Sequence, residues 1–299
     1  MVGTGSASGS EKWPKLFNTD LLEDFVFHIG PAGYPEGSKN PLDALQKVKE
    51  SGLNAIELQF VRQVKMGKEK ATSIGERARE LDLLVSAHAP YYINFNSRKE
   101  ETVEKSIDWV LRTAEIAGNA GAWIIVVHAA LYHGMNPGDV TGVVMRCIER
   151  CLDLMQERSL NPPIIGLETM GKKAAWGRID EIGEVVESID GVIPVVDFAH
   201  LHALGGGSLD SLEAVRSSLD DVLSYYDGHL HCHYSSVEFG ERGERRHLPI
   251  EEGQPRFETI AEVLGDWDSD VTIISETPSP LYGAVVMQEI LNSKSENRI

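Results

Sequence analysis

Short apolar runs alternate with amphipathic helical segments eight times along this chain. The apolar runs cover residues 25–30, 55–60, 83–89, 123–128, 164–168, 193–197, 229–235 and 271–276. Short apolar runs separated by helical patterns are typical of parallel strands in βαβ units. Eight such units predict a single (β/α)8 TIM barrel between residues 23 and 292 rather than an open doubly wound sheet. The turn after the first run also lacks the Gly-x-Gly-x-x-Gly pattern of a dinucleotide-binding sheet.

The segments between the strands carry helix signals. Leu42, Leu45 and Val48 are expected to share one face of the first helix. Pro137 is expected at the first position of another helix, where its missing N–H does no harm. Ser97 and Glu100 predict a capping box at the start of a further helix.

Both ends of the chain are expected to lie outside the barrel. Residues 1–22 begin with a Gly/Ser-rich stretch that predicts a disordered tail, and residues 293–299 form a short C-terminal tail. The N-terminal stretch lacks the apolar core of a signal peptide, and no window approaches the ~20 apolar residues of a membrane span. The three cysteines fit a reducing compartment. We therefore expect a cytoplasmic protein that does not enter a membrane.

The net charge of −18 argues against non-specific attraction to nucleic acid, because phosphate binding relies on Lys and Arg. Basic residues nevertheless gather after predicted strands. They are Arg62, Lys65, Lys68 and Lys70 after the second strand, Lys172, Lys173 and Arg178 after the fifth, and Arg242, Arg245 and Arg246 in a polar insertion, 236–255, after the seventh. Charge runs are usually solvated faces, but loops that follow barrel strands surround one rim. These three clusters are therefore compatible with a phosphate-binding ring on an acidic protein.

Histidines and acids stand at or just beyond the ends of most predicted strands. The predicted metal ligands are His88, His128, Glu168, Asp197, His200, His233, His247 and Glu276. One histidine at a strand end is more often a hydrogen-bonded core residue, but so many at the reactive rim of a barrel favour a metal site. Imidazole mixed with carboxylate suits zinc, manganese or iron. A carboxylate such as Glu168 can bridge two ions, and two ions can activate a water and stabilise the leaving oxygen of a phosphodiester.

Strand alternation sorts the side chains of the seventh strand. His229, His231 and His233 share one face, so Leu230 and Cys232 are expected to face the helices. The role of His231 is left open: it either supports a metal ligand or is itself the ligand in place of His233. The histidines interpreted as ordinary core residues are His28, His133, His202 and His229.

Two tyrosines, Tyr91 and Tyr92, follow the predicted ligand His88 by three and four positions. They either pack at the barrel rim or stack on a substrate ring or base. The sequence does not favour one of these roles over the other.

Four stretches carry a resemblance to known proteins. They are SAHAPYYIN at 86–94, GLETMG at 166–171, DFAH at 197–200 and SETP at 275–278. These stretches resemble the motifs of the endonuclease IV family, which are apurinic/apyrimidinic (AP) endonucleases within the xylose isomerase-like barrel superfamily. The resemblance extends over the whole barrel, from about Phe25 to Asn292. The first and third stretches are fairly specific, whereas SETP is weak alone.

The resemblance implies a site for two or three Zn²⁺ ions per chain, with Mn²⁺ as an alternative. Glu168 would be the catalytic bridge between two metals. His88 and His128 would hold one ion, Asp197, His233 and Glu276 its neighbour, and His200 and His247 a third. The reaction of the family is hydrolysis of the phosphodiester on the 5′ side of an abasic site, in DNA base excision repair.

The resemblance also implies double-stranded DNA with abasic sites as the partner. The damaged nucleotide would be turned out of the stack, which costs little where a base is already missing. The candidate DNA-binding residues are Tyr91, by its match to the family, and Arg62, Lys172, Arg245 and Arg246 from the basic loops. We expect a monomer, because a duplex needs open access to the rim.

One position departs from the family pattern. The family has an Asp two residues before the histidine that matches His247, and Arg245 stands there. Either Glu244 shifts in as a substitute, or the third ion is weak or absent. Two other functions stay open. One is a sugar isomerase or epimerase on the same barrel, which needs one ion and a general base; the other is a non-enzymatic protein that binds damaged DNA.

Overall fold

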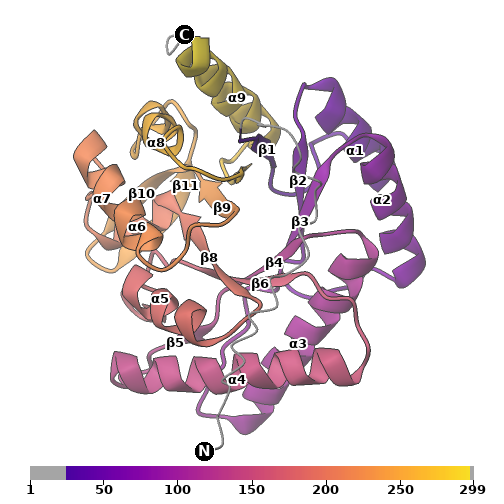
Figure 1. Ribbon diagram of the computed structural model, residues 1–299, viewed down its shortest axis with the longest axis vertical. Coiled ribbons are helices and arrows are strands. Elements are labelled where there is room, and N and C mark those ends of the chain that lie inside the picture. Colours follow the sequence, from indigo (N-terminus) through magenta and orange to yellow (C-terminus); the bar gives the residue numbers. More distant parts are fainter. Residues whose placement is uncertain (1–24, 297–299) are drawn as a thin grey trace, which may run out of the picture.

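Parallel strands form a barrel at the centre of the molecule, with helices around it (Figure 1). The computed structural model describes residues 25–296, so the predicted tail at 1–22 and residues 297–299 lie outside the described residues. The barrel strands within this range are β1 (Phe27–Pro31), β2 (Ala55–Gln59), β3 (Leu84–His88), β4 (Ile124–Val127), β6 (Ile164–Glu168), β8 (Val192–Asp197), β9 (Leu230–Tyr234) and β12 (Val271–Ser275). The predicted (β/α)8 barrel is confirmed.

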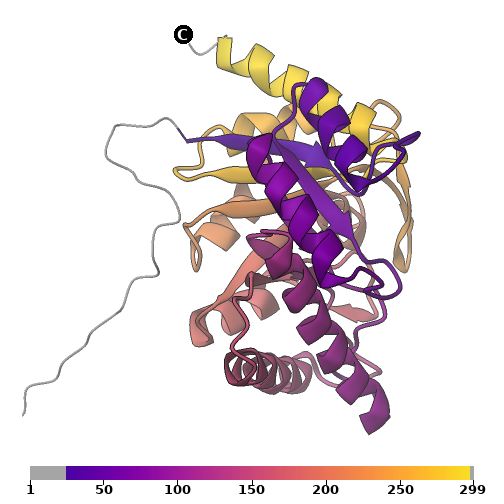
Figure 2. The same cartoon turned by 90° about the vertical axis from the view of Figure 1, so that its right-hand side faces the viewer.

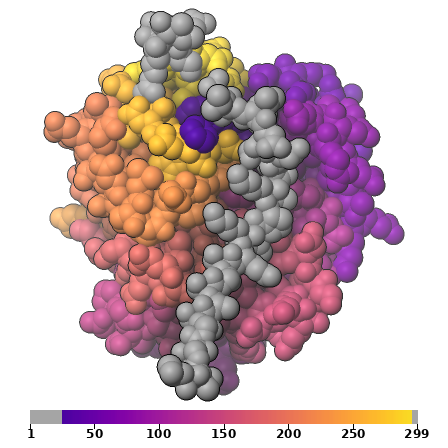
Figure 3. Space-filling view, viewed as in Figure 1, coloured from indigo at the N-terminus to yellow at the C-terminus, as the bar shows by residue number. Residues whose placement is uncertain are grey.

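The barrel is completed by contacts between the two ends of the described chain. The strand order is β1-β12-β9-β8-β6-β4-β3-β2, and β1 pairs with β12 in parallel, Phe27 opposite Val271. A parallel bridge from Ala32 to Glu57 joins β1 to β2. On the surface, the first described residues, in indigo, lie next to gold and yellow residues from the C-terminal part (Figure 3). All eight strands run in one direction, so their carboxyl ends meet at one rim.

Helices cover the outside of the strands in both ribbon views (Figure 2). They are α1 (Pro41–Glu50), α2 (Lys68–Glu80), α3 (Glu100–Asn119), α4 (Pro137–Glu157), α5 (Ile179–Ser188), α6 (Phe198–Leu204), α7 (Leu212–Leu223), α8 (Phe257–Leu264) and α9 (Pro280–Glu296). The core lies between these helices and the outer faces of the strands, where residues such as Ile56, Leu58 and Val110 are fully buried. Helix α9 continues to residue 296, past the predicted barrel boundary at 292. No helix among the described residues is long and apolar enough to cross a membrane.

Helix starts follow local capping chemistry, with one exception to the prediction. The side chain of Asn136 accepts a hydrogen bond from Gly138 N, and Pro137 occupies the first turn of α4 as expected. The predicted capping box of Ser97 and Glu100 is wrong, because Lys99 precedes α3 and makes no side-chain cap. Ser97 Oγ instead accepts a hydrogen bond from Lys99 N at 3.2 Å, within the turn before the helix.

The polar insertion after β9 is a hairpin of β10 (Ser236–Gly240) and β11 (Gly243–Leu248). Glu244 N donates to Gly171 O at 2.9 Å, which fastens the hairpin to the loop after β6. Gly243 has a φ of +95°, and a Cβ there would lie 2.0 Å from Gly171 O. Only glycine allows this close approach. A second small pair, β5 (Ala130–Leu131) with β7 (Ala175–Trp176), lies beside the same rim loops.

Side-chain direction on β9 agrees with the expected alternation. Leu230 and Cys232 belong to the core between strands and helices. His231 and His233 point into the barrel, where both contact Glu57. The barrel interior is therefore polar along this strand, from its middle to its carboxyl end at the rim.

Candidate metal centre

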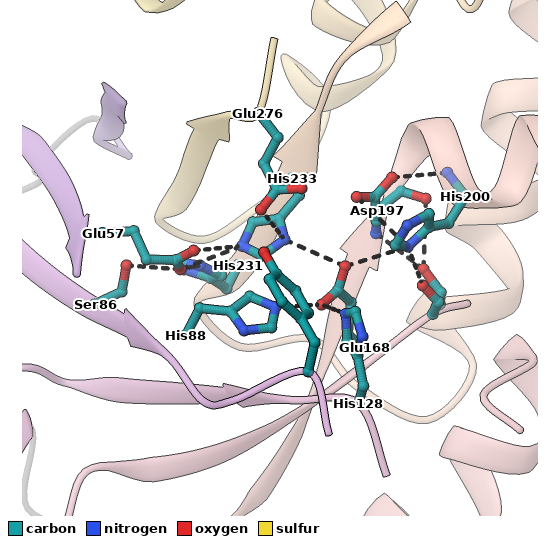
Figure 4. Close-up of polar contacts among 12 residues, drawn as sticks. Glu57, Ser86, His88, His128, Glu168, Asp197, His200, His231, His233 and Glu276 are labelled. Carbon is teal, nitrogen blue, oxygen red and sulfur yellow. Dashed lines mark hydrogen bonds and ion pairs between the residues drawn. The ribbon is translucent and has the colours of Figure 1, made fainter. Parts of the chain in front are cut away.

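The carboxyl ends of several strands bring acids and histidines into one cluster (Figure 4). His88 is the last residue of β3, Glu168 of β6 and Asp197 of β8. All three side chains are at most 1% exposed. Parallel strands place their last residues at the same rim, so residues far apart in sequence become neighbours. The sequence-based placement of these three residues at the rim is therefore what the structure has.

Glu168 lies at the centre of the cluster and divides it into two sides. Its Oε2 lies 3.1 Å from His88 Nε2 and 2.7 Å from His128 Nε2. Its Oε1 lies 3.2 Å from His200 Nδ1 and 3.3 Å from His233 Nδ1. Each carboxylate oxygen thus faces two imidazoles of its own, which is the arrangement of a carboxylate that bridges two cations.

Asp197 occupies the junction between strand and helix rather than a loop. It is the N-cap of α6, and its Oδ1 accepts from His200 N at 2.7 Å. Helix α6 begins directly after Asp197, which places His200 in its first turn, beside the cluster. Asp197 Oδ2 is buried and accepts no hydrogen bond from any residue the structure describes. Ligand atoms of Asp197, His233 and Glu276 lie within 4.8 Å of one another.

A third group forms where the hairpin reaches the rim. Glu244 Oε2 lies 3.4 Å from His200 Nε2, and Glu244 Oε1 lies 3.6 Å from His247 Nε2. Arg245 points elsewhere and pairs with Glu238 at 3.3 Å. Of the two outcomes left open by the sequence, the structure has the one in which Glu244 takes the acid position.

A β-bulge explains how Glu244 replaces the expected residue. In the hairpin Phe239 pairs with Glu244 and Glu238 with Arg246, so Arg245 is the extra residue opposite that step. An extra residue in one strand shifts the alternation of side chains beyond it. Glu244 therefore points toward the same group as His247, three positions later, while Arg245 turns to solvent.

Sequence reasoning missed one residue, Glu57, which extends the cluster from the rim into the barrel interior. Glu57, on β2, is fully buried, and its carboxylate contacts His231 Nε2 at 3.0 Å and His233 Nε2 at 3.1 Å. Glu57 also accepts from Ser86 Oγ at 3.0 Å and Gln59 Nε2 at 2.9 Å. The available signal was an acid inside an otherwise apolar strand, on the same face as Gln59 and opposite to its apolar neighbours.

The histidines interpreted as core residues have ordinary local partners, but His133 is exposed, so the interpretation of that residue as part of the core is wrong. His202 Nδ1 accepts from Leu209 N at 3.1 Å, and His133 Nε2 lies 3.0 Å from Asn94 Nδ2. His229 stacks on Trp123, with ring centroids 4.1 Å apart. These rings lie away from Glu168 and its partners.

The predicted DNA-binding residues surround the cluster to different degrees. Tyr91 is 40% exposed, and its ring lies 4.6 Å from the ring of His88 and 5.1 Å from that of His128. Lys172 lies 3.9 Å from Glu244 Oε2, and a surface pocket is lined by Lys172, Arg242 and Arg245. The remaining two, Arg62 and Arg246, are exposed, and Arg246 pairs with Glu238 at 2.7 Å. Tyr91 and Lys172 thus border the acids and histidines directly.

Burial and opposite charge together set the protonation of the cluster. Burial would raise the pKa of the Glu168 carboxyl, but the imidazoles of His128 and His233 outweigh it and hold that pKa well below its usual range. At Asp197 burial dominates and raises the pKa. Burial opposes the charged form of His200, yet Asp197 and Glu168 raise the His200 pKa well above its usual value.

The donor set fits divalent metal ions. Protons on histidine balance the buried acids, and a cation at the same place would replace those protons. Within residues 25–296 the buried Asp197 Oδ2 has no hydrogen-bond partner, as expected of an oxygen whose partner is an ion. Nitrogen and carboxylate ligands without sulfur suit zinc, manganese or iron. The nominated ligand atoms fall into overlapping groups around Glu168, Asp197 and His200, each of which could hold an ion.

Comparisons with known proteins agree with this architecture. The model of the xylose isomerase-like TIM barrel family matches residues 45–294. An uncharacterized protein of Methanocaldococcus jannaschii is 32% identical over 276 residues, which cover 91% of this chain and 99% of that protein. A probable endonuclease 4 of Malacoplasma penetrans is 28% identical over 244 residues, 78% of each chain.

Solved structures show the same fold in proteins of two kinds. Endonuclease IV from Thermus thermophilus superimposes with a TM-score of 0.70 at 19% identity, over 91% of this chain and 99% of that one. A D-tagatose 3-epimerase-like protein gives a TM-score of 0.69 at 18% identity, over 89% and 97%. At these identities the likeness concerns the fold, and the choice of chemistry depends on the side chains of the cluster.

Proposed function

The chain belongs to the xylose isomerase-like TIM barrel family, and we propose that it is a metal-dependent AP endonuclease. It hydrolyses the DNA phosphodiester on the 5′ side of an abasic site, as part of base excision repair. The relative named as a probable endonuclease 4 supports this assignment. So does the endonuclease IV resemblance of the motifs at 86–94 and 197–200.

The observation that carries the proposal is the position of Glu168. Its two oxygens face two different pairs of histidines, at distances of 2.7 to 3.3 Å. A site for one ion needs a single set of ligands, whereas a shared carboxylate between two sets serves two ions. Paired ions are the device by which many nucleases and phosphatases act on phosphate esters.

We assign the ligands by the groups they form. His88 and His128 with Glu168 would hold one ion, and Asp197, His233 and Glu276 with Glu168 the second. His200, Glu244 and His247 would hold a third. Zinc is the expected metal, with manganese as an alternative. Such ions supply a water activated for attack and stabilise the charge of the leaving oxygen.

The remaining chemistry belongs to the side chains of this chain. Glu168 fixes the relative position of the two ligand sets. Tyr91, at the rim beside His88 and His128, offers a ring against which the sugar of an abasic site can pack. Lys172 and the arginines at 62, 245 and 246 would contact phosphates and set the register of the duplex.

We further propose a cytoplasmic monomer. The cysteines of the described chain are free and buried, which fits a reducing compartment. A duplex bent over the rim needs that face open, so a monomer suits the substrate.

The test is incision of a duplex that carries one stable abasic analogue, in moderate salt, with zinc or manganese supplied. We expect a single cut on the 5′ side of the lesion that a strong chelator abolishes and added metal restores. An undamaged duplex of the same sequence is the control. Absence of cleavage by a folded, metal-loaded protein contradicts the proposal.

A sugar isomerase or epimerase is the second candidate, and one observation favours it. A single isomerase ion is typically held by two acids together with a histidine and an aspartate. The chain offers such a set on the fold of the D-tagatose 3-epimerase-like protein, namely Glu168, Glu276, His233 and Asp197. The net charge of −18 also suits a small sugar better than DNA. The number of ions per chain separates the candidates: one ion supports the isomerase, and two or three support the nuclease.

A further inference from the structure

A second polar layer lies inside the barrel, one step below Glu168. Its centre is Glu57, which is fully buried on β2. Four groups surround the carboxylate: Ser86 Oγ at 3.0 Å, Gln59 Nε2 at 2.9 Å, His231 Nε2 at 3.0 Å and His233 Nε2 at 3.1 Å. Figure 4 shows Glu57 and His231 beside His233, on the side away from Glu168. A buried carboxylate with four neighbours has a specific role in the structure, because its burial is costly.

His233 joins this layer to the metal cluster through its two ring nitrogens. Nε2 lies on Glu57, and Nδ1 lies 3.3 Å from Glu168 Oε1 and 3.8 Å from Glu276 Oε1. A neutral imidazole carries a proton on one nitrogen and a lone pair on the other. If the proton is on Nε2, the N–H donates a hydrogen bond to Glu57, and the lone pair of Nδ1 points toward Glu168 and Glu276.

His231 holds a different position in the same layer. Its Nε2 also meets Glu57, but its Nδ1 is buried and has no hydrogen-bond partner among residues 25–296. Its ring lies against Trp123 in an edge-on contact, with centroids 5.6 Å apart. His231 therefore braces Glu57 from the side and does not take part in the groups around Glu168.

We propose that Glu57 is a positioning residue that fixes the ring and the tautomer of His233, so that His233 binds the second metal ion through Nδ1. His231 is the brace of Glu57 and is not a ligand. This inference rests on the metal site of the proposed function. Hydrogen bonds from ligand histidines to carboxylates orient the ring and increase its basicity toward the metal.

Ligand atoms of Glu57, His231 and His233 lie within 4.8 Å of one another, as an ion site would need, but the hydrogen bonds to Glu57 favour a supporting role. A carboxylate offers about four lone-pair positions. Three of the hydrogen bonds reach Oε2 and one reaches Oε1, so both oxygens of Glu57 have protein partners; the partners are Ser86, His231 and His233 on Oε2 and Gln59 on Oε1. The role of the layer is thus to support the ligand above it.

Glu57 also connects the metal cluster to the rim. Gln59, which donates to Glu57, accepts from the hydroxyl of Tyr91 at 3.1 Å. One chain of hydrogen bonds therefore runs from an exposed aromatic side chain through Gln59 and Glu57 to His233. Contact of substrate with Tyr91 would bear on the same carboxylate that positions His233.

The test uses two variants of Glu57 and one matched control. E57Q keeps the shape of the side chain but removes its charge, and E57L removes both charge and acceptors. E181Q is the control, since Glu181 is also buried and accepts from Tyr132, Gly177 and Arg178 away from the cluster. Zinc content per chain and zinc affinity are measured by competition with a chelator, and folding by thermal unfolding.

We expect one zinc ion to bind about 10–100-fold more weakly in E57Q, and still more weakly in E57L, with the other ions unaffected. E181Q lowers the unfolding midpoint without changing zinc affinity. If both Glu57 variants fold and bind every ion as the wild type does, Glu57 has only a structural role and the inference is wrong. If the wild type binds an additional ion that H231Q loses, the layer is a metal site and the inference is also wrong.

A second readout separates this inference from the proposed function. Imidazole nitrogen NMR of the zinc-loaded wild type should show the proton of His233 on Nε2 and the metal on Nδ1. In chelated protein the Nε2 proton should still be detected through its bond to Glu57, and E57L should lose that signal. A wild type that binds no zinc overturns the proposed function. The chelated spectra of wild type and E57L still show whether Glu57 orients His233.

Discussion

Three histidines along one face of a single strand end in three different environments. His229, just before β9, stacks on Trp123 and contacts Thr272 Oγ1 at 2.8 Å. His231 meets one carboxylate, Glu57. His233 lies between carboxylates on both sides of its ring. The surroundings change from aromatic to acidic within five residues of chain.

The comparison shows that strand parity alone does not identify a ligand. All three side chains point into the barrel, and only their neighbours differ. Burial lowers the pKa of His229 and of His231, whereas acids around His233 overcome burial and raise its pKa. A histidine is prepared for a metal where at least one of its nitrogens meets acids that would share the ion.

The largest expected effect comes from removing the bridge at the acidic end. E168Q should lower the rate of abasic-site incision by more than about 100-fold, because cation stabilisation of the transition state is worth several kcal/mol. H229Q, at the aromatic end of the same barrel, should cleave at nearly the wild-type rate. Single-turnover rates at saturating zinc check both. Equal incision rates for wild type and E168Q would contradict the bridging role of Glu168.

The next effect is on stability and concerns bound metal. An ion present at 100 times its dissociation constant adds about 2.7 kcal/mol to the folded state. For a chain of this size that corresponds to a rise in the unfolding midpoint of roughly 4–5 °C. Chelation of the wild type should lower the midpoint by such an amount, and chelation of E168Q by less. An unchanged midpoint would mean that bound metal does not stabilise the fold and that protonated histidines alone balance the buried acids.

A smaller effect tests the third group. Burial would raise the pKa of Glu244, but its hydrogen bond and charge contact with His200 and the charge of His247 lower that pKa to about 2. Glu244 is therefore an ionised acid near neutral pH. E244Q should weaken one ion by about tenfold or more and leave the others in place. R245Q is the control, because Arg245 faces solvent, and it should retain all ions while binding DNA less tightly and with a shallower dependence on salt.

The smallest effect concerns the aromatic end and acid. Burial, followed by the charges of His28 and His231, lowers the pKa of His229 to about 3, from an ordinary value of 6.5. The neutral ring thus stabilises the fold above pH 6.5, and this contribution is lost as the pH falls toward 3. We expect a loss of about 1 kcal/mol from this residue between pH 6.5 and 5.5. Denaturant unfolding of wild type and H229Q at both pH values measures it; parallel losses in the two proteins would contradict the assignment.

The sequence predicted the barrel because local patterns decide it. Short apolar runs between amphipathic helices describe the βα unit, and the alternation on β9 correctly sent Leu230 and Cys232 toward the helices. The positions of His88, Glu168 and Asp197 at the rim follow from the same logic, because the ends of parallel strands meet. These features need only neighbouring residues to be read.

Features that depend on distant pairing were beyond the pattern. Glu57 meets His231 across 174 positions of sequence, so nothing near either residue announces the contact. The place of Glu244 depends on a bulge whose extra residue, Arg245, shows only once the hairpin pairs. The metal roles and the DNA contacts remain proposals, because they depend on partners that meet these side chains from outside the chain.

The order in which the chain is made has a consequence for how the proposed metal site forms. The nominated ligands extend from His88 to Glu276, and β12 must pair with β1, 244 positions away, before the last of them is in place. A growing chain on the ribosome therefore displays only scattered imidazoles and acids, none of which grips an ion well alone. In the proposed metal enzyme, an ion would therefore enter the closed barrel rather than the growing chain.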